Sequence, residues 1–162
     1  MAQTKGDKAV GINLGIAPCL ESGSNVTNFG IGAKFQYNVT NPVRLEADLD
    51  YWFKDKATDV FDISANIQYI FHIGSKVNVY PFVGLGYAHI GFSWSLDDDD
   101  LLYYTRSSNL EVSTSLNRFL FNLGVGAEYK VASNVYAQFE LRYQYLKDFN
   151  RLPINVGITY RF

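Results

Sequence analysis

The densest group of side chains that could do chemistry is a run of four carboxylates, Asp97, Asp98, Asp99 and Asp100. Carboxylate oxygens are the ligands that Ca²⁺ and Mg²⁺ prefer, so the run could bind a divalent cation. A run of like charges is more commonly a solvated turn that keeps a protruding segment in water. We interpret the run as such a turn, keep the cation site as the weaker alternative, and predict no cofactor.

The histidines and serines offer a second possible chemistry, that of a hydrolase. A serine nucleophile needs a histidine base close by and an acid that orients the base. His72 and Ser75 lie around a predicted turn, and His89 and Ser93 lie four residues apart, but neither pair has an acid in place. We therefore predict that the protein is not an enzyme. With two histidines and one cysteine, Cys19, it also lacks a dense transition-metal cluster and an internal disulfide.

Charged side chains recur at every second position along several segments. They share the polar side of an alternating pattern and comprise Lys34, Arg44, Glu46, Asp48, Arg118, Glu128, Glu140, Arg142 and Arg161, with Asp50 and Asp62 beside them. If this side is enclosed, the charges need partners, because an unpaired buried charge is costly. Two interpretations stay open, a gated ion path and a salt-bridged plug that fixes the architecture; we favour the plug.

Eight segments with period-two alternation must hold these charges. They are Ala9–Ile16, Asn28–Asn38, Val43–Phe53, Val60–His72, Val77–Trp94, Leu116–Lys130, Val135–Leu146 and Pro153–Phe162. This period belongs to strands with one apolar and one polar face, and most segments are long enough to cross a bilayer at a tilt. Pro81 lacks a ladder donor and predicts a bulge. We predict an all-β fold, an eight-stranded antiparallel up-and-down transmembrane β-barrel, as a single domain over residues 1–162 with residues 1–8 as an N-terminal tail.

Composition excludes two other classes of protein. Aromatic residues make up 16% of the chain, yet the mean hydropathy is only −0.07. No run of eighteen apolar residues occurs, which argues against a helical membrane protein. The net charge of −2 provides no field that would attract nucleic acid, so no nucleic-acid partner is expected.

The connections between segments alternate in character. Residues 17–27, 54–59, 95–115 and 147–152 form the longer or more charged connections, and residues 39–42, 73–76 and 131–134 form short turns. In an up-and-down barrel this alternation places all long loops at one end. Outer-membrane barrels have the same asymmetry, with long loops outside the cell and both termini in the periplasm.

Alternation alone does not say which face points inward. A soluble barrel with apolar residues around an internal ligand also alternates. The polar face carries many glycines and charges of both signs, which suits a crowded interior, whereas large Tyr, Phe and Leu side chains would overfill eight strands. We therefore favour a membrane barrel. Aromatic residues near the segment ends predict two interfacial girdles. The first comprises Tyr51, Trp52, Trp94 and Tyr145, and the second comprises Tyr37, Tyr129, Tyr160 and Phe162.

The last segment, Pro153–Phe162, alternates strictly and ends on an aromatic residue. It resembles the C-terminal signal by which the outer-membrane assembly machinery recognises its clients. Asn155, Gly157, Tyr160 and Phe162 fit that signal.

The whole chain resembles the small eight-stranded outer-membrane barrels of the OmpA transmembrane domain and OmpX type, and Val79–Tyr87 looks like their fifth strand. The resemblance implies a bacterial outer-membrane barrel without a through-pore, in contact with outer-membrane lipid and lipopolysaccharide. It implies a structural or surface role: envelope integrity, adhesion or binding of an extracellular protein through the loop 95–115. The alternatives are a lipid-modifying outer-membrane enzyme and a soluble, lipocalin-like ligand-binding barrel.

Overall fold

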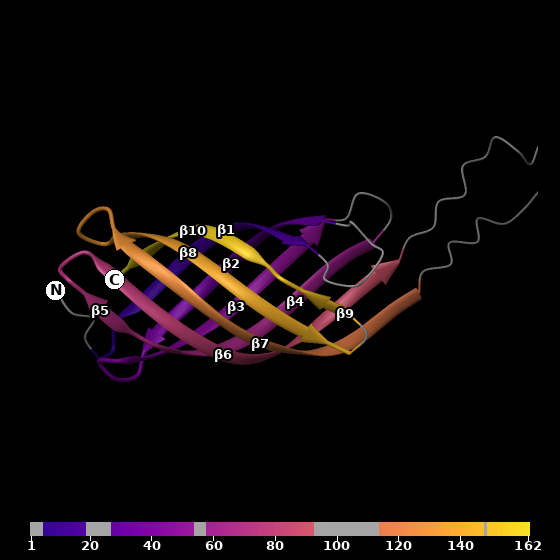
Figure 1. Ribbon diagram of the computed structural model, residues 1–162, viewed down its shortest axis with the longest axis horizontal. Coiled ribbons are helices and arrows are strands. Elements are labelled where there is room, and N and C mark those ends of the chain that lie inside the picture. Colours follow the sequence, from indigo (N-terminus) through magenta and orange to yellow (C-terminus); the bar gives the residue numbers. More distant parts are fainter. Residues whose placement is uncertain (1–4, 19–26, 54–57, 93–113, 148) are drawn as a thin grey trace, which may run out of the picture.

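The computed structural model describes residues 5–18, 27–53, 58–92, 114–147 and 149–162, which form a closed cylinder of tilted strands (Figure 1). The strands are β1 (Lys8–Pro18), β2 (Thr27–Asn38), β3 (Val43–Phe53), β4 (Thr58–Tyr69), β5 (Phe71–Ile73), β6 (Val77–Phe92), β7 (Thr114–Lys130), β8 (Val135–Leu146), β9 (Phe149–Arg151) and β10 (Ile154–Arg161). Among the described residues, no helix has the length and apolarity to cross a membrane.

The strands pair with their sequence neighbours in antiparallel order around the ring. β10 closes it by pairing with β1 on one side and β8 on the other. β5 continues β4 in the same register against β6, since Gln68 faces Phe82 and Phe71 faces Val79. β9 likewise continues β10 against β8. The cylinder is therefore the predicted eight-stranded antiparallel barrel.

The proline in the fifth barrel strand acts differently from the prediction. The bulge predicted at Pro81 is absent, because the pairing of β6 with both neighbouring strands keeps one register on either side of it. Proline has no N–H to donate to a neighbouring strand. The strand that pairs with β6 is therefore interrupted near Pro81, in the gap between β4 and β5. The Ile70 N–H in this gap donates to the Pro42 carbonyl at 2.7 Å.

The last barrel strand begins earlier than predicted. Phe149–Arg151, which the sequence placed in a loop, forms β9 and pairs with the end of β8. The strand breaks at Leu152 and Pro153, where the Arg142 N–H still donates to the Pro153 carbonyl at 2.9 Å. This extension brings Arg151 onto the inner face, where it is completely buried.

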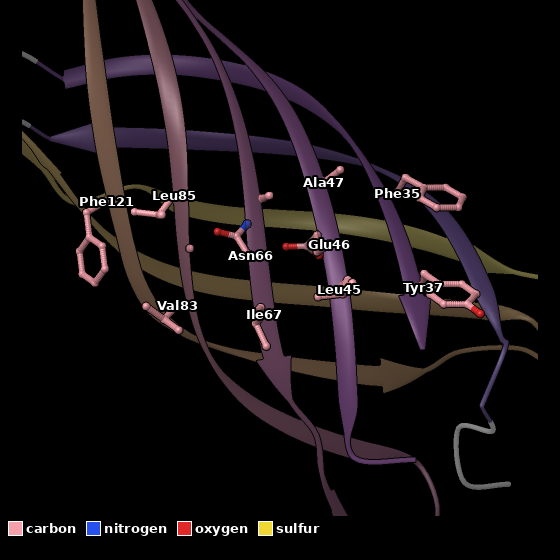
Figure 2. A pocket seen from close by; sticks show the side chains of 12 residues that line it. Phe35, Tyr37, Leu45, Glu46, Ala47, Asn66, Ile67, Val83, Leu85 and Phe121 are labelled. Atoms are coloured by element: carbon pink, nitrogen blue, oxygen red, sulfur yellow. The ribbon is translucent and has the colours of Figure 1, made fainter. Parts of the chain in front are cut away.

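The outer face of the barrel is apolar and the inner face is polar, as the sequence predicted. Leu85, Ile12 and Ile158 are more than half exposed on the outside, whereas Arg44 and Asp62 are completely buried inside. Small residues leave a shallow apolar groove of about 850 Å³ on the outer surface of β2, β3, β4, β6 and β7 (Figure 2). Its floor includes Ala47 and Ala65, which face each other on β3 and β4.

Glycines make room inside the barrel for three inward aromatic rings. Trp52 lies against Gly30, Tyr80 against Gly126 and Phe82 against Gly124, and a Cβ on any of these glycines would overlap the ring. Their lack of a side chain is therefore what admits an indole, a phenol and a phenyl ring to a narrow lumen.

The predicted girdles need one correction. Trp52 is only 1% exposed and donates its indole N–H to Asp62 at 3.0 Å, so it lies in the lumen and not at the membrane interface. Tyr145 is exposed on the outer face, and Tyr51 stacks edge-on with Phe53 there. Trp94 lies outside the described residues. At the other end Tyr129, Tyr160 and Phe162 are exposed, and Tyr37 is half-buried.

Candidate functional site: the charged lumen

Two buried bases and three carboxylates occupy the middle of the lumen. Lys34 on β2 lies 2.9 Å from Glu140 on β8 and 3.5 Å from Glu46 on β3. Arg142 on β8 lies 2.7 Å from Asp48 and 3.3 Å from Glu140. Every one of these side chains is at most 2% exposed. Since each base contacts two carboxylates, these five residues form one cluster, which we call the central cluster.

The ion pair between Arg142 and Asp48 crosses the full width of the barrel. In the closed ring of eight barrel strands, β3 and β8 are four strands apart in either direction, so they form opposite walls. Charge-assisted hydrogen bonds of this length are among the stronger polar contacts in proteins. The central cluster therefore ties opposite walls together and fills the cross-section between them.

Polar neighbours extend the central cluster along the axis. Asp50 accepts a hydrogen bond from Asn13 at 3.1 Å and lies 3.5 Å from Arg142. Asn66 donates to Asp48 at 2.7 Å, and Asn122 donates to Asn66 at 3.1 Å. These amides come from β1, β4 and β7, so together with β2, β3 and β8 six strands of the barrel contribute to one hydrogen-bonded network.

A second cluster lies nearer the short turns. Glu128 on β7 contacts Arg44 at 2.8 Å and Arg161 at 3.3 Å, and it accepts a hydrogen bond from Asn78 at 2.7 Å. Tyr80 joins the two clusters, because its hydroxyl donates to Glu140 at 2.9 Å and Arg44 lies 4.7 Å from its ring centre. The charged residues described by the structure are thus grouped in layers along the axis.

A third charged group, the ion pair between Arg151 and Asp62, lies at the loop end. Arg151 also donates to Gln144 at 2.6 Å, and its guanidinium lies 5.1 Å from the Trp52 ring. The pair joins β9 to β4, which are again opposite walls of the ring. Sequence reasoning misses Arg151 because Pro153 has the character of a strand start. Arg151 lies four residues before Asn155, so period-two alternation places both side chains on the same face of the strand. That pattern is the sequence signal that could have identified Arg151.

The structure brings predicted lumen charges into ion pairs within these clusters, namely Lys34, Arg44, Glu46, Asp48, Glu128, Glu140, Arg142 and Arg161. Arg118 is half-buried on β7 opposite Ala88 on β6. The predicted assembly-signal residues lie on the closing strand or directly after it. Asn155 is buried inside, and a Cβ at Gly157 would press on the Ile12 carbonyl of β1. Tyr160 and Phe162 stack on the outer face with ring centres 6.5 Å apart.

The two histidines weighed for a hydrolase site contact asparagines. His72 Nδ1 lies 2.7 Å from the Asn78 side-chain oxygen, and His89 Nδ1 lies 2.7 Å from that of Asn117. Within the described residues, no group of three or more His, Cys, Asp or Glu side chains could hold a metal ion. Ser93, Cys19 and the four carboxylates Asp97, Asp98, Asp99 and Asp100 lie outside the described residues.

A closed ring of eight antiparallel strands, apolar outside and salt-bridged inside, defines a membrane-spanning β-barrel. Comparison with known proteins gives the family. The chain belongs to the outer membrane protein β-barrel domain family, whose sequence model matches residues 1–162. A comparison with curated proteins finds no match.

Solved structures show the same fold at low sequence identity. Neisserial surface protein A is 18% identical with a TM-score of 0.78, and the alignment covers 98% of this chain and 100% of that one. The attachment invasion locus protein Ail of Yersinia pestis is 19% identical with a TM-score of 0.68 and the same coverage. The N-terminal barrel of Pseudomonas aeruginosa OprF is 18% identical with a TM-score of 0.61, covering 99% and 100%.

Proposed function

We propose that this outer-membrane barrel is neither a pore nor an enzyme, and that it acts as a structural anchor presenting its long loops for surface interactions. The observation that carries the proposal is the set of ion pairs joining opposite walls, Arg142 with Asp48 and Arg151 with Asp62. Side chains bonded across the diameter leave little room for hydrated ions to pass. Envelope integrity, adhesion and partner binding are all compatible with a plugged barrel.

The proposed orientation has the long loops outside the cell and both termini in the periplasm. Both termini and the short turns lie at the same end in Figure 1, and β6 and β7 extend beyond the other strands at the opposite end. This arrangement supports the orientation that small outer-membrane barrels adopt. Outer-membrane lipid and lipopolysaccharide would then contact the apolar outer face.

The plug is tested by electrical recording across planar lipid bilayers. The refolded chain is expected to give no conductance steps under conditions in which a general porin, as positive control, conducts. Replacing both Asp48 and Arg142 with alanine removes the ion pair across the diameter, and channel activity should then appear if that pair closes the lumen. Steady conductance from the unaltered protein would contradict the proposal.

The loop 95–115 is our proposed site of partner binding. Ail has been crystallised in complex with the heparin analogue sucrose octasulfate. The four consecutive carboxylates of this loop would repel such a polysulfated ligand, so we propose a protein partner with a basic surface. The corresponding cation-site hypothesis for Asp97, Asp98, Asp99 and Asp100 stays the weaker alternative.

A pair of variants tests the loop. Deletion of residues 97–104 should abolish adhesion or partner binding, and replacing the four aspartates with asparagine should weaken it and remove its salt dependence. Both variants should still fold, as judged by different gel mobility of boiled and unboiled samples. A binding phenotype that survives the deletion would rule the loop out.

We further propose that Asn155, Gly157, Tyr160 and Phe162 are recognised by the outer-membrane assembly machinery. The exposed Tyr160 and Phe162 rings on the closing strand support this role. Deleting Phe162 should slow assembly in cells while leaving spontaneous folding in detergent almost unchanged. Equal slowing in detergent would indicate a purely structural role.

A further inference from the structure

A polar pocket opens at the turn end of the lumen. Its volume is about 140 Å³, and its lining includes His72, Ser75, Lys76, Asn78, Lys130 and Tyr136. The lining residues come from β5, from the β5–β6 turn and from the adjoining ends of β6, β7 and β8. Gly74, whose φ of 77° suits glycine, allows the tight turn that places Lys76 beside this opening.

The electrostatics of the pocket favour an anion. Lys76 and Lys130 line it, whereas none of its lining residues carries a carboxylate. Directly beneath it, Glu128 is already held by Arg44 and Arg161, so this cluster carries one positive charge in excess. Arg161 also lies 4.0 Å from the ring centre of Tyr136, which lines the pocket. Formal charge therefore rises from the net negative central cluster to the lysines at the turn end of the lumen.

Hydrogen bonds fix the orientation of the Asn78 amide and of the His72 ring, which line the pocket. The Asn78 amide nitrogen donates to the Glu128 carboxylate at 2.7 Å, so its oxygen faces His72. His72 must then donate from Nδ1, which lies 2.7 Å from that oxygen. These hydrogen bonds connect the His72 ring through Asn78 to Glu128 in the buried cluster, and they hold the ring at the opening of the pocket.

We propose that this pocket binds a compact oxyanion of the phosphate class. Lys76 and Lys130 would supply charge-assisted hydrogen bonds, and Ser75 a neutral one. A volume of 140 Å³ equals that of only about five water molecules and lies below the roughly 300–1,000 Å³ typical of drug-sized ligands. A nucleotide or a glycan is therefore too large. The phosphate could be free in solution or part of a phospholipid headgroup.

The test uses the full chain, refolded in an uncharged, phosphate-free detergent and titrated with inorganic phosphate. Amide resonances of Gly74, Lys76 and Lys130 should shift and saturate together. The double variant K76Q/K130Q should bind phosphate at least about tenfold more weakly. The matched control is K5Q/K8Q, which removes two exposed charges outside the pocket lining and should bind like the unaltered protein.

Two results would overturn the site: no saturable shift of these amides in detergent, or equal loss of affinity in both double variants. Unaltered gel mobility of the two variants excludes misfolding as the cause. Repeating the titration in phosphatidylglycerol bilayers distinguishes the two sources. An unchanged response there identifies free phosphate as the ligand, and a response lost because lipid already occupies the pocket identifies the headgroup.

Discussion

The two faces of the barrel wall obey opposite rules, although they alternate residue by residue along the same strands. On β3, Leu45 and Leu49 are more than 40% exposed toward the membrane, whereas Glu46 and Asp48 are at most 2% exposed in the lumen. Lipid accepts almost any apolar side chain, because its chains adapt to the surface. The lumen encloses charged and polar groups away from bulk solvent, so each side chain there needs a particular partner. On the outer face it is enough that a side chain is apolar, whereas on the inner face the particular residue matters.

Removing a charge from the central cluster should break this comparison most strongly. The variant R142L removes the ion pair of Asp48 and leaves Glu46 and Glu140 with Lys34 as their remaining basic partner, so it should lower the free energy of unfolding by about 3–5 kcal/mol. Urea unfolding in detergent measures the change. The control R161L removes a more exposed guanidinium whose partner Glu128 keeps Arg44, and it should cost less. Unchanged midpoints for R142L would contradict the plug.

Introducing a charge on the apolar outer face tests the other side of the comparison. Leu123 is 54% exposed on β7, and L123R would place a charge in the hydrocarbon region. We expect a cost of roughly 2–4 kcal/mol when the barrel folds into lipid vesicles. Val131 lies in the short turn that follows β7, so V131R should cost about 0–1 kcal/mol. Equal costs for the two variants would mean that the apolar face does not meet lipid.

A smaller effect should come from adding one methyl group inside. Tyr80 lies against Gly126, so G126A should force the ring aside and cost about 1–3 kcal/mol. At Gly91 the nearest atom to an added Cβ is the Asp59 carbonyl oxygen, 3.9 Å away, so G91A is the matched control. Thermal or urea unfolding of both variants gives the comparison. A stable G126A would show that the lumen repacks easily.

The sequence predicts the two faces well because their physics depends on residue class alone. Period-two alternation identifies every barrel strand, and the parity of Arg44, Glu46 and Asp48 on β3 places them inside. The partners across the diameter depend on barrel closure and stagger, which no local pattern contains. The pairing of Arg142 with Asp48 therefore needed the structure.

The errors have the same origin. Trp52 shares the parity of the inward charges, but its place near a strand end suggested an interfacial residue instead. Arg151 was missed because Pro153 looked like a strand start, although pairing with β8 keeps the same register before and after the break at Pro153. Pro81 suggested a bulge, while the barrel keeps its register and loses only local pairing. In each case tertiary closure overrides a local signal.

The smallest expected effect is that of L85A on the outer face, and it sharpens the comparison because the same substitution on the inner face, L120A, serves as its reference. Leu120 is 2% exposed inside and packs with Trp52, Val60 and Leu146, so L120A should leave a cavity and cost about 2–5 kcal/mol. Leu85 is 69% exposed outside, and lipid chains can fill the space that L85A leaves. Because lipid tails are as apolar as leucine, L85A should cost less than about 1 kcal/mol in bilayers.

The pair is measured by urea unfolding from the same lipid vesicles, with circular dichroism to confirm the folded state. The two leucines occupy neighbouring positions across the β6–β7 ladder, since Leu85 faces Phe121 and Gly86 faces Leu120. The two leucines therefore lie at nearly the same depth in the membrane, and they differ mainly in whether they face lipid or the lumen. If the two costs were equal, Leu85 would have to be packed on the outside as tightly as Leu120 is in the lumen. The outer groove near Ala47 and Ala65 would then hold an occupant that adapts its shape less readily than lipid.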